Sequence, residues 1–174
     1  GDGELGPVIA VADSKGNVRG YVGNANCPTE YYNNGKINVS KAVGKNGVLN
    51  VMRDYGSGDP YIGQVELVSG EIAEDITNYF ATSEQVPSSV GLGVLMNKDN
   101  TVREAGGFII QLMPNATDEF IDKLEKRIKE IKSVTNMLDE GMTPEDILEH
   151  ILGDMDLQIL DTVPTEFYCN CSKE

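Results

Sequence analysis

The chain has 174 residues, of which 40% are hydrophobic, and a formal net charge of −14 from 14 basic and 28 acidic side chains. This length suffices for one domain with a core of its own. The negative charge disfavours nucleic acid and anionic membrane surfaces as partners, and no apolar run is long enough to span a membrane. Three cysteines, an odd number, argue against the disulfide framework of a secreted protein, so we expect a cytoplasmic protein.

The first half of the sequence alternates short apolar segments with turn residues, which is typical of strands. Residues 7–12 and 18–22 predict a hairpin around a polar loop. The glycines of Gly1–Gly6 have the spacing of a dinucleotide-binding loop, but that loop needs a strand before it and a helix after it. Here a strand follows, so these glycines indicate a turn. Further strands are expected at 37–39, 48–52 and 62–68.

The middle of the sequence changes period. Ile72, Ile76, Tyr79 and Phe80 recur at helical spacing and predict a helix that ends before Pro87. Two strands are then expected, an alternating one at 90–96 and one at 105–113. The continuous apolar run of the second predicts a strand buried on both faces.

From residue 117 the sequence predicts a helical hairpin. Apolar residues recur at three- and four-residue spacing, and Gly141 is a typical helix stop. Thr143 and Pro144 indicate the start of a second helix that ends at Gly153. Burial against the sheet and service as a groove for a partner remain alternative roles for the apolar face. The candidate partner-binding residues are Ile121, Leu124, Ile128, Ile147 and Ile151.

Cys169 and Cys171 lie two positions apart near the end of the sequence, after a connector at 157–165. In extended backbone two such side chains point to the same side, so both sulfurs can approach one point. Zinc accepts thiolates, but a closed structural site needs four ligands. The pair is therefore either half of a metal or redox site or two unrelated thiols.

Residues suited to catalysis are few. The chain has one histidine, His150, which is expected on a solvated helix surface. Cys27 has no basic neighbour in sequence to activate it, so an inert thiol is expected. The composition alone leaves a Cys27–His150 nucleophile pair open, but no local pattern supports it. Phosphate-binding and zinc-protease motifs are absent from the sequence.

Five stretches together resemble one bacterial family, the redox-regulated 33 kDa chaperonin, a cytoplasmic heat-shock holdase. They are VGKNG at 43–47, GQVELVSGEIAED at 63–75, SEQVPS at 83–88, AGGFIIQLMP at 105–114 and FYCNCSKE at 167–174. The order of these motifs is that of the family, and the resemblance covers essentially the whole chain. The family has a further segment before Gly1 and a Cys-x-x-Cys after the Cys-x-Cys, and neither is in this sequence. Cys27 matches no family motif.

The resemblance implies an α+β fold: a three-layer domain around a buried mixed sheet, followed by a helical hairpin. It implies a division into residues 1–114, the sheet domain lacking its N-terminal part, and residues 115–156, the helical hairpin. Residues 157–174 would hold a connector and the first half of a zinc and redox module. Cys169 and Cys171 would be redox-active and would be two of four zinc ligands, with the other two beyond this chain.

The resemblance also implies a function: a holdase that binds unfolding proteins and prevents their aggregation under heat and oxidative stress. Oxidation of the thiolates would release zinc and unfold the module, which would free apolar surface for clients. Such a protein would not be an enzyme and would bind neither nucleic acid nor membrane, and the resemblance leaves a homodimer open. Two other functions stay open from the residues alone: a thiol–disulfide oxidoreductase using Cys169 and Cys171, and a passive zinc-dependent assembly module.

Overall fold

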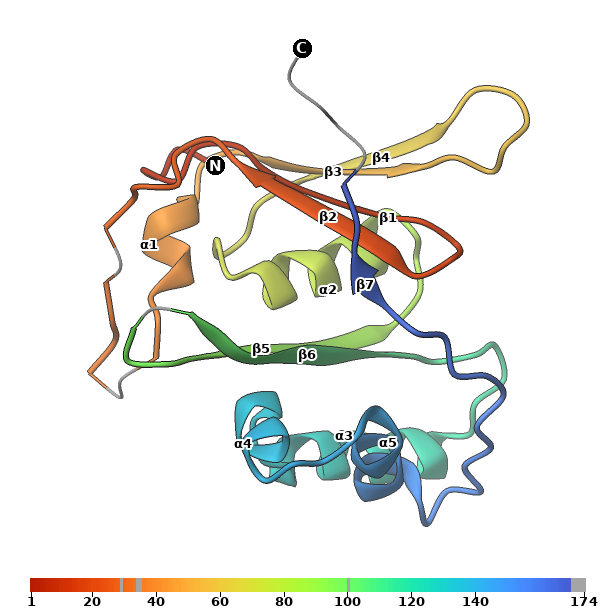
Figure 1. Cartoon of the computed structure of the whole chain (residues 1–174). Coiled ribbons are helices and arrows are strands. Elements are labelled where there is room, and N and C mark those ends of the chain that lie inside the picture. Colours follow the sequence, from red (N-terminus) through yellow and green to blue (C-terminus); the bar gives the residue numbers. More distant parts are fainter. Residues whose placement is uncertain (29, 34–35, 100, 170–174) are drawn as a thin grey trace. The chain divides into compact units, whose positions relative to one another are not determined.

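The computed structural model describes residues 1–28, 30–33, 36–99 and 101–169, and is drawn in Figure 1. The chain divides into two compact units. Unit 1 comprises Gly1–Asp75 and Leu160–Glu174, and unit 2 comprises Ile76–Ile159. Among the described residues no helix is both long and apolar enough to cross a membrane.

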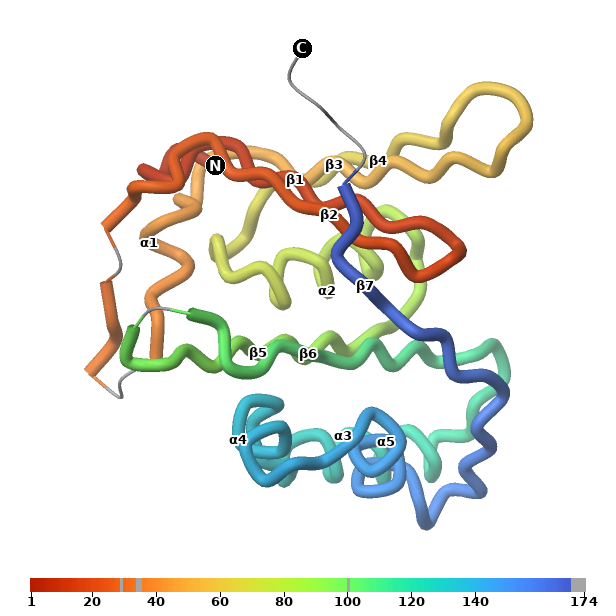
Figure 2. The backbone as a smooth tube through the Cα atoms, viewed as in Figure 1, coloured from red at the N-terminus to blue at the C-terminus, as the bar shows by residue number. Residues whose placement is uncertain are grey.

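Unit 1 contains a three-stranded sheet of order β1-β2-β7. Strands β1 (Val8–Ala12) and β2 (Asn17–Val22) pair antiparallel, as expected for the hairpin. Its loop is shaped by Asp13, whose carboxylate accepts hydrogen bonds from the Lys15 and Asn17 N–H groups. Strand β7 (Glu166–Phe167) returns from the other end of the chain to pair parallel with β2, which the sequence did not predict (Figure 2).

Unit 1 also contains the antiparallel pair β3 (Val48–Arg53) and β4 (Tyr61–Glu66), both at expected places. Residues 37–39 were expected as a strand, and this prediction is wrong. The short helix α1 (Val39–Val43) begins there, because the Asn38 side chain accepts a hydrogen bond from the Lys41 N–H and so caps the first turn.

Helix α2 (Ile72–Thr82) begins in unit 1 and continues in unit 2, at the place that the periodicity predicts. The pair β5 (Ser88–Met96) and β6 (Val102–Gln111) then forms an antiparallel ladder. Burial alternates along β6, so the expectation of a strand buried on both faces is wrong. One face of this ladder packs against helices, whereas the other leaves Leu92, Val94 and Ile109 exposed.

Three helices, and not two, follow the strands: α3 (Asp118–Glu130), α4 (Val134–Asp139) and α5 (Pro144–Leu152). The expected first helix is broken where Ile131 adopts extended backbone and Ser133 caps α4. Within unit 2, Figure 1 shows these helices on one side of the β5–β6 pair. The α+β class is thus confirmed, with the strands arranged as three small sheets.

The core of unit 2 lies between these helices and β6. Val134 and Met137 of α4 pack with Ile147 and Ile151 of α5, and Phe108 and Ile110 of β6 pack against them. The close approach of α4 depends on Gly93, because a Cβ added there would lie 2.9 Å from the Thr135 backbone nitrogen. The compact units do not follow the expected ranges 1–114, 115–156 and 157–174, which stay a prediction.

Candidate functional site

Strand β7 positions Cys169. The Glu166 N–H donates to the Gly16 carbonyl at 3.1 Å, and the Tyr168 N–H donates to the Val18 carbonyl at 3.0 Å. Cys169 follows directly as an exposed residue, so the chain reaches it along the edge of β2. The sequence gave no sign that a strand leads into Cys169, because two residues are too short for a periodic pattern.

Cys169 and Cys171 are the two sequence-predicted zinc ligands. Cys169 is disulfide-bonded in the structure, and Cys171 lies outside the described residues. A thiolate is a donor that zinc accepts, but the described part of the chain contains no group of three or more His, Cys, Asp or Glu side chains that could hold a metal ion. The described residues therefore do not form a zinc site by themselves, and zinc binding by Cys169 and Cys171 stays a prediction.

The two residues of the candidate nucleophile pair, Cys27 and His150, lie in different units of the chain. Cys27 is a free, half-buried thiol whose Sγ lies 3.6 Å from the Pro28 carbonyl oxygen. It belongs to unit 1, whereas His150 belongs to unit 2. His150 is exposed on α5, as the sequence predicted for a solvated helix surface.

The five candidate client-binding residues divide into two groups. Leu124, Ile147 and Ile151 are buried, with Ile151 at 0% exposure, so these three belong to the core in this structure. Ile121 and Ile128 on α3 are half-buried. Ile147 and Ile151 pack with Phe108 and Ile110 of β6, so burial against the sheet, one of the two roles left open by the sequence, accounts for these two residues. A role in binding clients would require movement of the helices.

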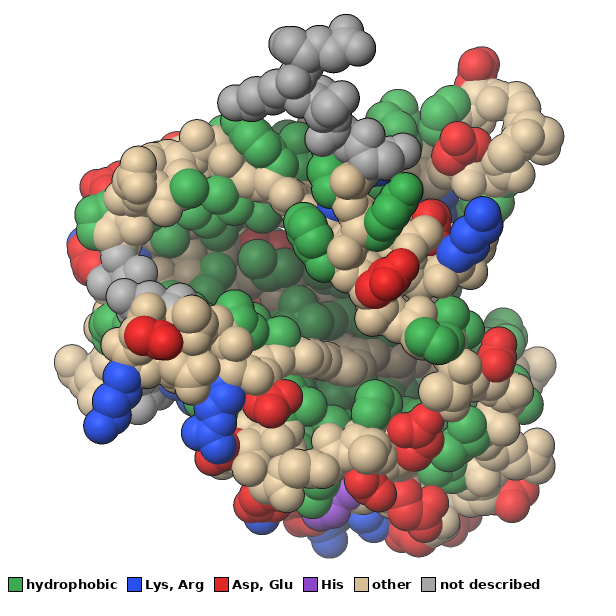
Figure 3. Space-filling view, in the orientation of Figure 1, with side chains coloured by type: hydrophobic (Ala, Val, Ile, Leu, Met, Phe, Trp, Pro, Cys, Tyr) green, Lys and Arg blue, Asp and Glu red, His purple; other side chains and the backbone are tan. Residues whose placement is uncertain are grey.

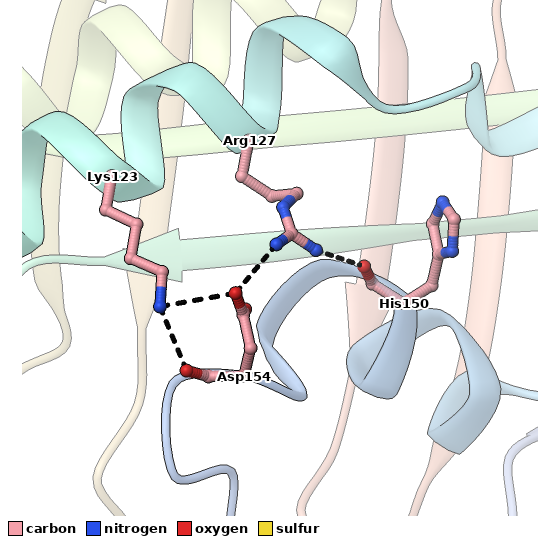
Figure 4. Close-up of polar contacts among 4 residues, drawn as sticks. All are labelled: Lys123, Arg127, His150 and Asp154. Atoms are coloured by element: carbon pink, nitrogen blue, oxygen red, sulfur yellow. Dashed lines mark hydrogen bonds and ion pairs between the residues drawn. The ribbon is translucent and has the colours of Figure 1, made fainter.

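A group of ion pairs joins α3 to the end of α5 (Figure 4). Lys123 Nζ and Arg127 Nη2 lie 3.2 Å and 2.9 Å from Asp154 Oδ2, and Arg127 also donates to the His150 carbonyl. The imidazole of His150 points away from these contacts in Figure 4. The hydrogen bond from Lys123 lowers the pKa of Asp154 most, desolvation opposes it, and the Arg127 charge lowers the pKa further by a smaller amount than desolvation raises it. Lys123 and Arg127 also donate hydrogen bonds to the backbone carbonyls of Asp154 and His150, at the C-terminal end of α5.

Two of the recognised stretches, 43–47 and 63–75, meet within unit 1. Gly44 and Gly70 both have positive φ, and a Cβ added to Gly70 would lie 2.6 Å from the Gly44 carbonyl oxygen. The buried carboxylate of Asp75 accepts hydrogen bonds from the Val68 and Ser69 N–H groups. These motifs therefore shape the backbone of unit 1 and supply no reactive constellation.

Sequence reasoning missed the exposed apolar surface of the strands. Every residue of β1 is exposed, and the register places Ile9 beside Tyr21 on one face of the hairpin. Their exposed fractions are 50% and 58%. The apolar run of β1 was a sufficient signal for a strand, but it cannot reveal that neither face is covered by the described residues.

Comparison with known proteins gives one consistent result. A family model described as "Hsp33 protein" matches residues 1–174. The chain is 59% identical over 174 residues to a 33 kDa chaperonin of Lachnoclostridium phytofermentans, covering 99% of this chain and 59% of that protein. It is 55% identical over 174 residues to a 33 kDa chaperonin of Clostridioides difficile, covering 100% of this chain and 60% of the relative.

A solved structure has the same fold. The crystal structure of a 33 kDa chaperonin, a heat shock protein 33 homologue, from Thermotoga maritima matches with a TM-score of 0.89 at 40% identity. The match covers 99% of this chain and 58% of the other. The chain thus spans about three fifths of the length of these relatives.

Proposed function

Because the chain belongs to the Hsp33 family, we propose that it is part of a molecular chaperone that binds unfolding proteins and prevents their aggregation. The names of the relatives describe chaperonins rather than enzymes, which supports binding without turnover.

The observation that carries this proposal is the exposed apolar surface of the β1–β2 hairpin. Ile9, Val11 and Tyr21 are all at least 42% exposed and lie on one face of the ladder. Exposed apolar patches of soluble proteins mark interaction sites. On the face drawn in Figure 3, hydrophobic side chains reach the surface among acidic ones. The net charge of −14 keeps such a protein in solution despite its apolar surface.

Redox control through Cys169 and Cys171 is the second part of the proposal. Oxidation by a peroxide would join the two sulfurs, with loss of two protons and two electrons, while the peroxide is reduced to two molecules of water. When zinc is bound to thiolates of the complete protein, its binding free energy favours the folded state of the ligand-bearing segment. Cys169 lies two residues after the end of β7, the strand that is paired with β2.

The test is light scattering of a heat-unfolded client protein with and without a molar excess of this chain. We expect suppression of aggregation in excess reductant, because the β1–β2 face is already exposed. An acidic protein of similar mass without chaperone activity is the control. Failure to suppress aggregation both in reductant and after peroxide would refute the chaperone proposal. Protection only after peroxide would show that the exposed face is insufficient and that the cysteines control the client surface.

A further inference from the structure

The edge of β2 that lies opposite β1 is only partly covered. β2 runs from Asn17 to Val22, but β7 pairs with Asn17 and Val18 alone. No other described strand pairs with this edge. The rest of this edge, which includes Gly20 and Val22, therefore has no described strand beside it.

The hydrogen bonds show which backbone groups these are. On the β1 side, the Asn17 carbonyl accepts from the Asp13 N–H, and the Gly23 N–H donates to the Pro7 carbonyl. Odd-numbered residues of β2 thus face β1. Because the backbone groups of a strand alternate with period two, even-numbered residues face the opposite edge.

The contacts with β7 agree with this alternation. The carbonyls that accept from β7 belong to Gly16 and Val18. Gly20 and Val22 are the next even-numbered residues, and β7 does not reach them. Gly20 also leaves room on its side-chain face, because a Cβ added there would meet only the Ile9 carbonyl oxygen, at 3.6 Å.

Few interactions attach β7 to this edge of β2. It is two residues long, and its Phe167 side chain is 73% exposed, so apolar burial contributes little to its attachment. Two backbone donors, the N–H groups of Glu166 and Tyr168, hold it to β2. A longer extended segment could make the same bonds and add those of Gly20 and Val22.

We propose that the open edge of β2 binds an extended segment of an unfolded protein by strand addition, and that β7 is the intramolecular segment that competes for this edge. The inference rests on the proposed chaperone function for the identity of the partner. Strand addition recognises the main chain, which every unfolded polypeptide offers, so it suits a protein that binds clients of many sequences. Val22 and Tyr21 flank the edge and can contact alternate side chains of the added strand.

Release of β7 would lengthen the free edge of β2. Tyr168 is the last residue that donates to β2, and Cys169 follows it. In this structure β7 is paired with β2 while Cys169 is disulfide-bonded, so the competition between β7 and a client segment is independent of that disulfide.

The first arm of the test detaches β7 within the full chain. Glu166→Pro with Tyr168→Pro removes both N–H groups that donate to β2. The matched control is Phe167→Pro, since the Phe167 N–H faces away from β2. We expect the double variant to bind fluorescein-labelled, reduced and carboxymethylated α-lactalbumin about tenfold more tightly by fluorescence anisotropy, whereas the control changes little. Equal affinities for the double variant and the wild type would contradict competition by β7.

The second arm blocks the edge. Gly20→Pro removes the Gly20 N–H, the central donor on the open edge of β2. Proline is tolerated in an edge strand at a position where the original N–H faces away from the paired strand, here β1. Gly20→Ala is the control. We expect client binding roughly tenfold weaker for Gly20→Pro, the change that corresponds to about 1.4 kcal/mol of lost backbone hydrogen bonding. Circular dichroism and the amide spectrum of β1 check that the hairpin is intact.

The decisive readout is amide hydrogen exchange measured by NMR on the wild-type chain with the same client. Strand addition predicts protection of the Gly20 and Val22 amides on binding and no change at Arg19 and Tyr21, which face β1. Binding by anisotropy without protection of Gly20 and Val22 would overturn this inference and leave the chaperone function standing. Absence of any binding would instead overturn the proposed function and this inference with it.

Discussion

The hairpins β1–β2 and β5–β6 are both antiparallel pairs that carry apolar side chains, and they differ in surroundings. One face of β5–β6 is closed by α4 and α5, whose core residues Met137 and Ile151 are fully buried. In the second half of β6 exposed and half-buried residues alternate, whereas every residue of β1 is exposed.

The difference shows that an apolar strand is a core strand only when a neighbouring element can approach it. Gly93 and Gly106 lie opposite each other on β5–β6 and allow α4 close to the backbone. Gly20 of β2 offers similar space, but no described helix fills it. The helix-covered face of β5–β6 therefore contributes to the core of unit 2, whereas its other face, like the β1–β2 hairpin, keeps apolar side chains exposed.

The largest expected effect comes from a cavity in the closed region. Met137→Ala removes a side chain with 0% exposure and should lower the free energy of unfolding of unit 2 by about 2–5 kcal/mol. The matched control is Met52→Ala on β3, where the side chain is 65% exposed and the expected change is within about 0.5 kcal/mol. Urea denaturation followed by circular dichroism measures both. Similar losses for the two variants would refute the distinction between the regions.

A smaller effect is expected from filling the space under α4. Gly93→Ala brings a methyl group into contact with the Thr135 backbone and should cost about 1–3 kcal/mol, because α4 must shift. Gly20→Ala, the corresponding change in β2, meets only an ordinary contact and should be almost neutral. Thermal denaturation compares the two. Equal tolerance at both positions would show that α4 does not depend on the glycine.

The ion pairs at Asp154 should add a pH-dependent contribution. The pKa of this carboxyl lies below its ordinary value of 3.8 in the folded protein, so its ionised form stabilises the α3–α5 contact at neutral pH. This contribution is lost as the pH falls through the folded-state pKa. Asp154→Asn should therefore be less stable than the wild type at pH 7, and the difference should shrink in acid below pH 3.8.

The matched control for this prediction is Glu140→Gln. Glu140 pairs with Lys132 at similar exposure, but this pair does not join α3 to α5. Urea denaturation at neutral and acid pH gives both stabilities. A difference between wild type and Asp154→Asn that persists unchanged in acid would show that charge does not cause it.

The smallest effect on stability is expected at the cysteines. Cys169 is exposed and lies outside the core of either unit. Replacing Cys169 and Cys171 together by serine should leave the thermal midpoint of the reduced chain nearly unchanged, because the apolar contacts that stabilise the fold are elsewhere. Calorimetry in reductant measures the midpoint. A large drop would mean that the pair contributes to the fold.

The sequence predicted most elements because their signals are local. The alternation in 90–96, the period of α2 and the Thr143–Pro144 start of α5 each depend on near neighbours. The sequence did not predict the helix starts at Asn38 and Ser133, because a single capping side chain overrides a periodic pattern.

The site was less predictable than the fold. Cys169 and Cys171 were singled out because cysteine spacing is a direct chemical signal, and their role as a metal and redox pair stays a prediction. The sequence did not decide whether Leu124, Ile147 and Ile151 are buried in the protein. An apolar helix face has the same sequence pattern whether it packs on a sheet or on a partner. The pairing of β7 with β2 joins residues far apart in sequence, and no local pattern records it.

The central claim is that the exposed face of β1–β2 binds unfolded proteins. The most direct measurement is the dissociation constant of labelled, reduced and carboxymethylated α-lactalbumin in excess reductant. Ile9→Thr with Tyr21→Thr keeps strand-forming residues but removes most of the apolar face, and binding should weaken at least about tenfold. Met113→Thr, at an exposed residue of unit 2, should bind as the wild type does. Unchanged affinity in the Ile9→Thr, Tyr21→Thr chain, with its fold intact by circular dichroism, would contradict the claim.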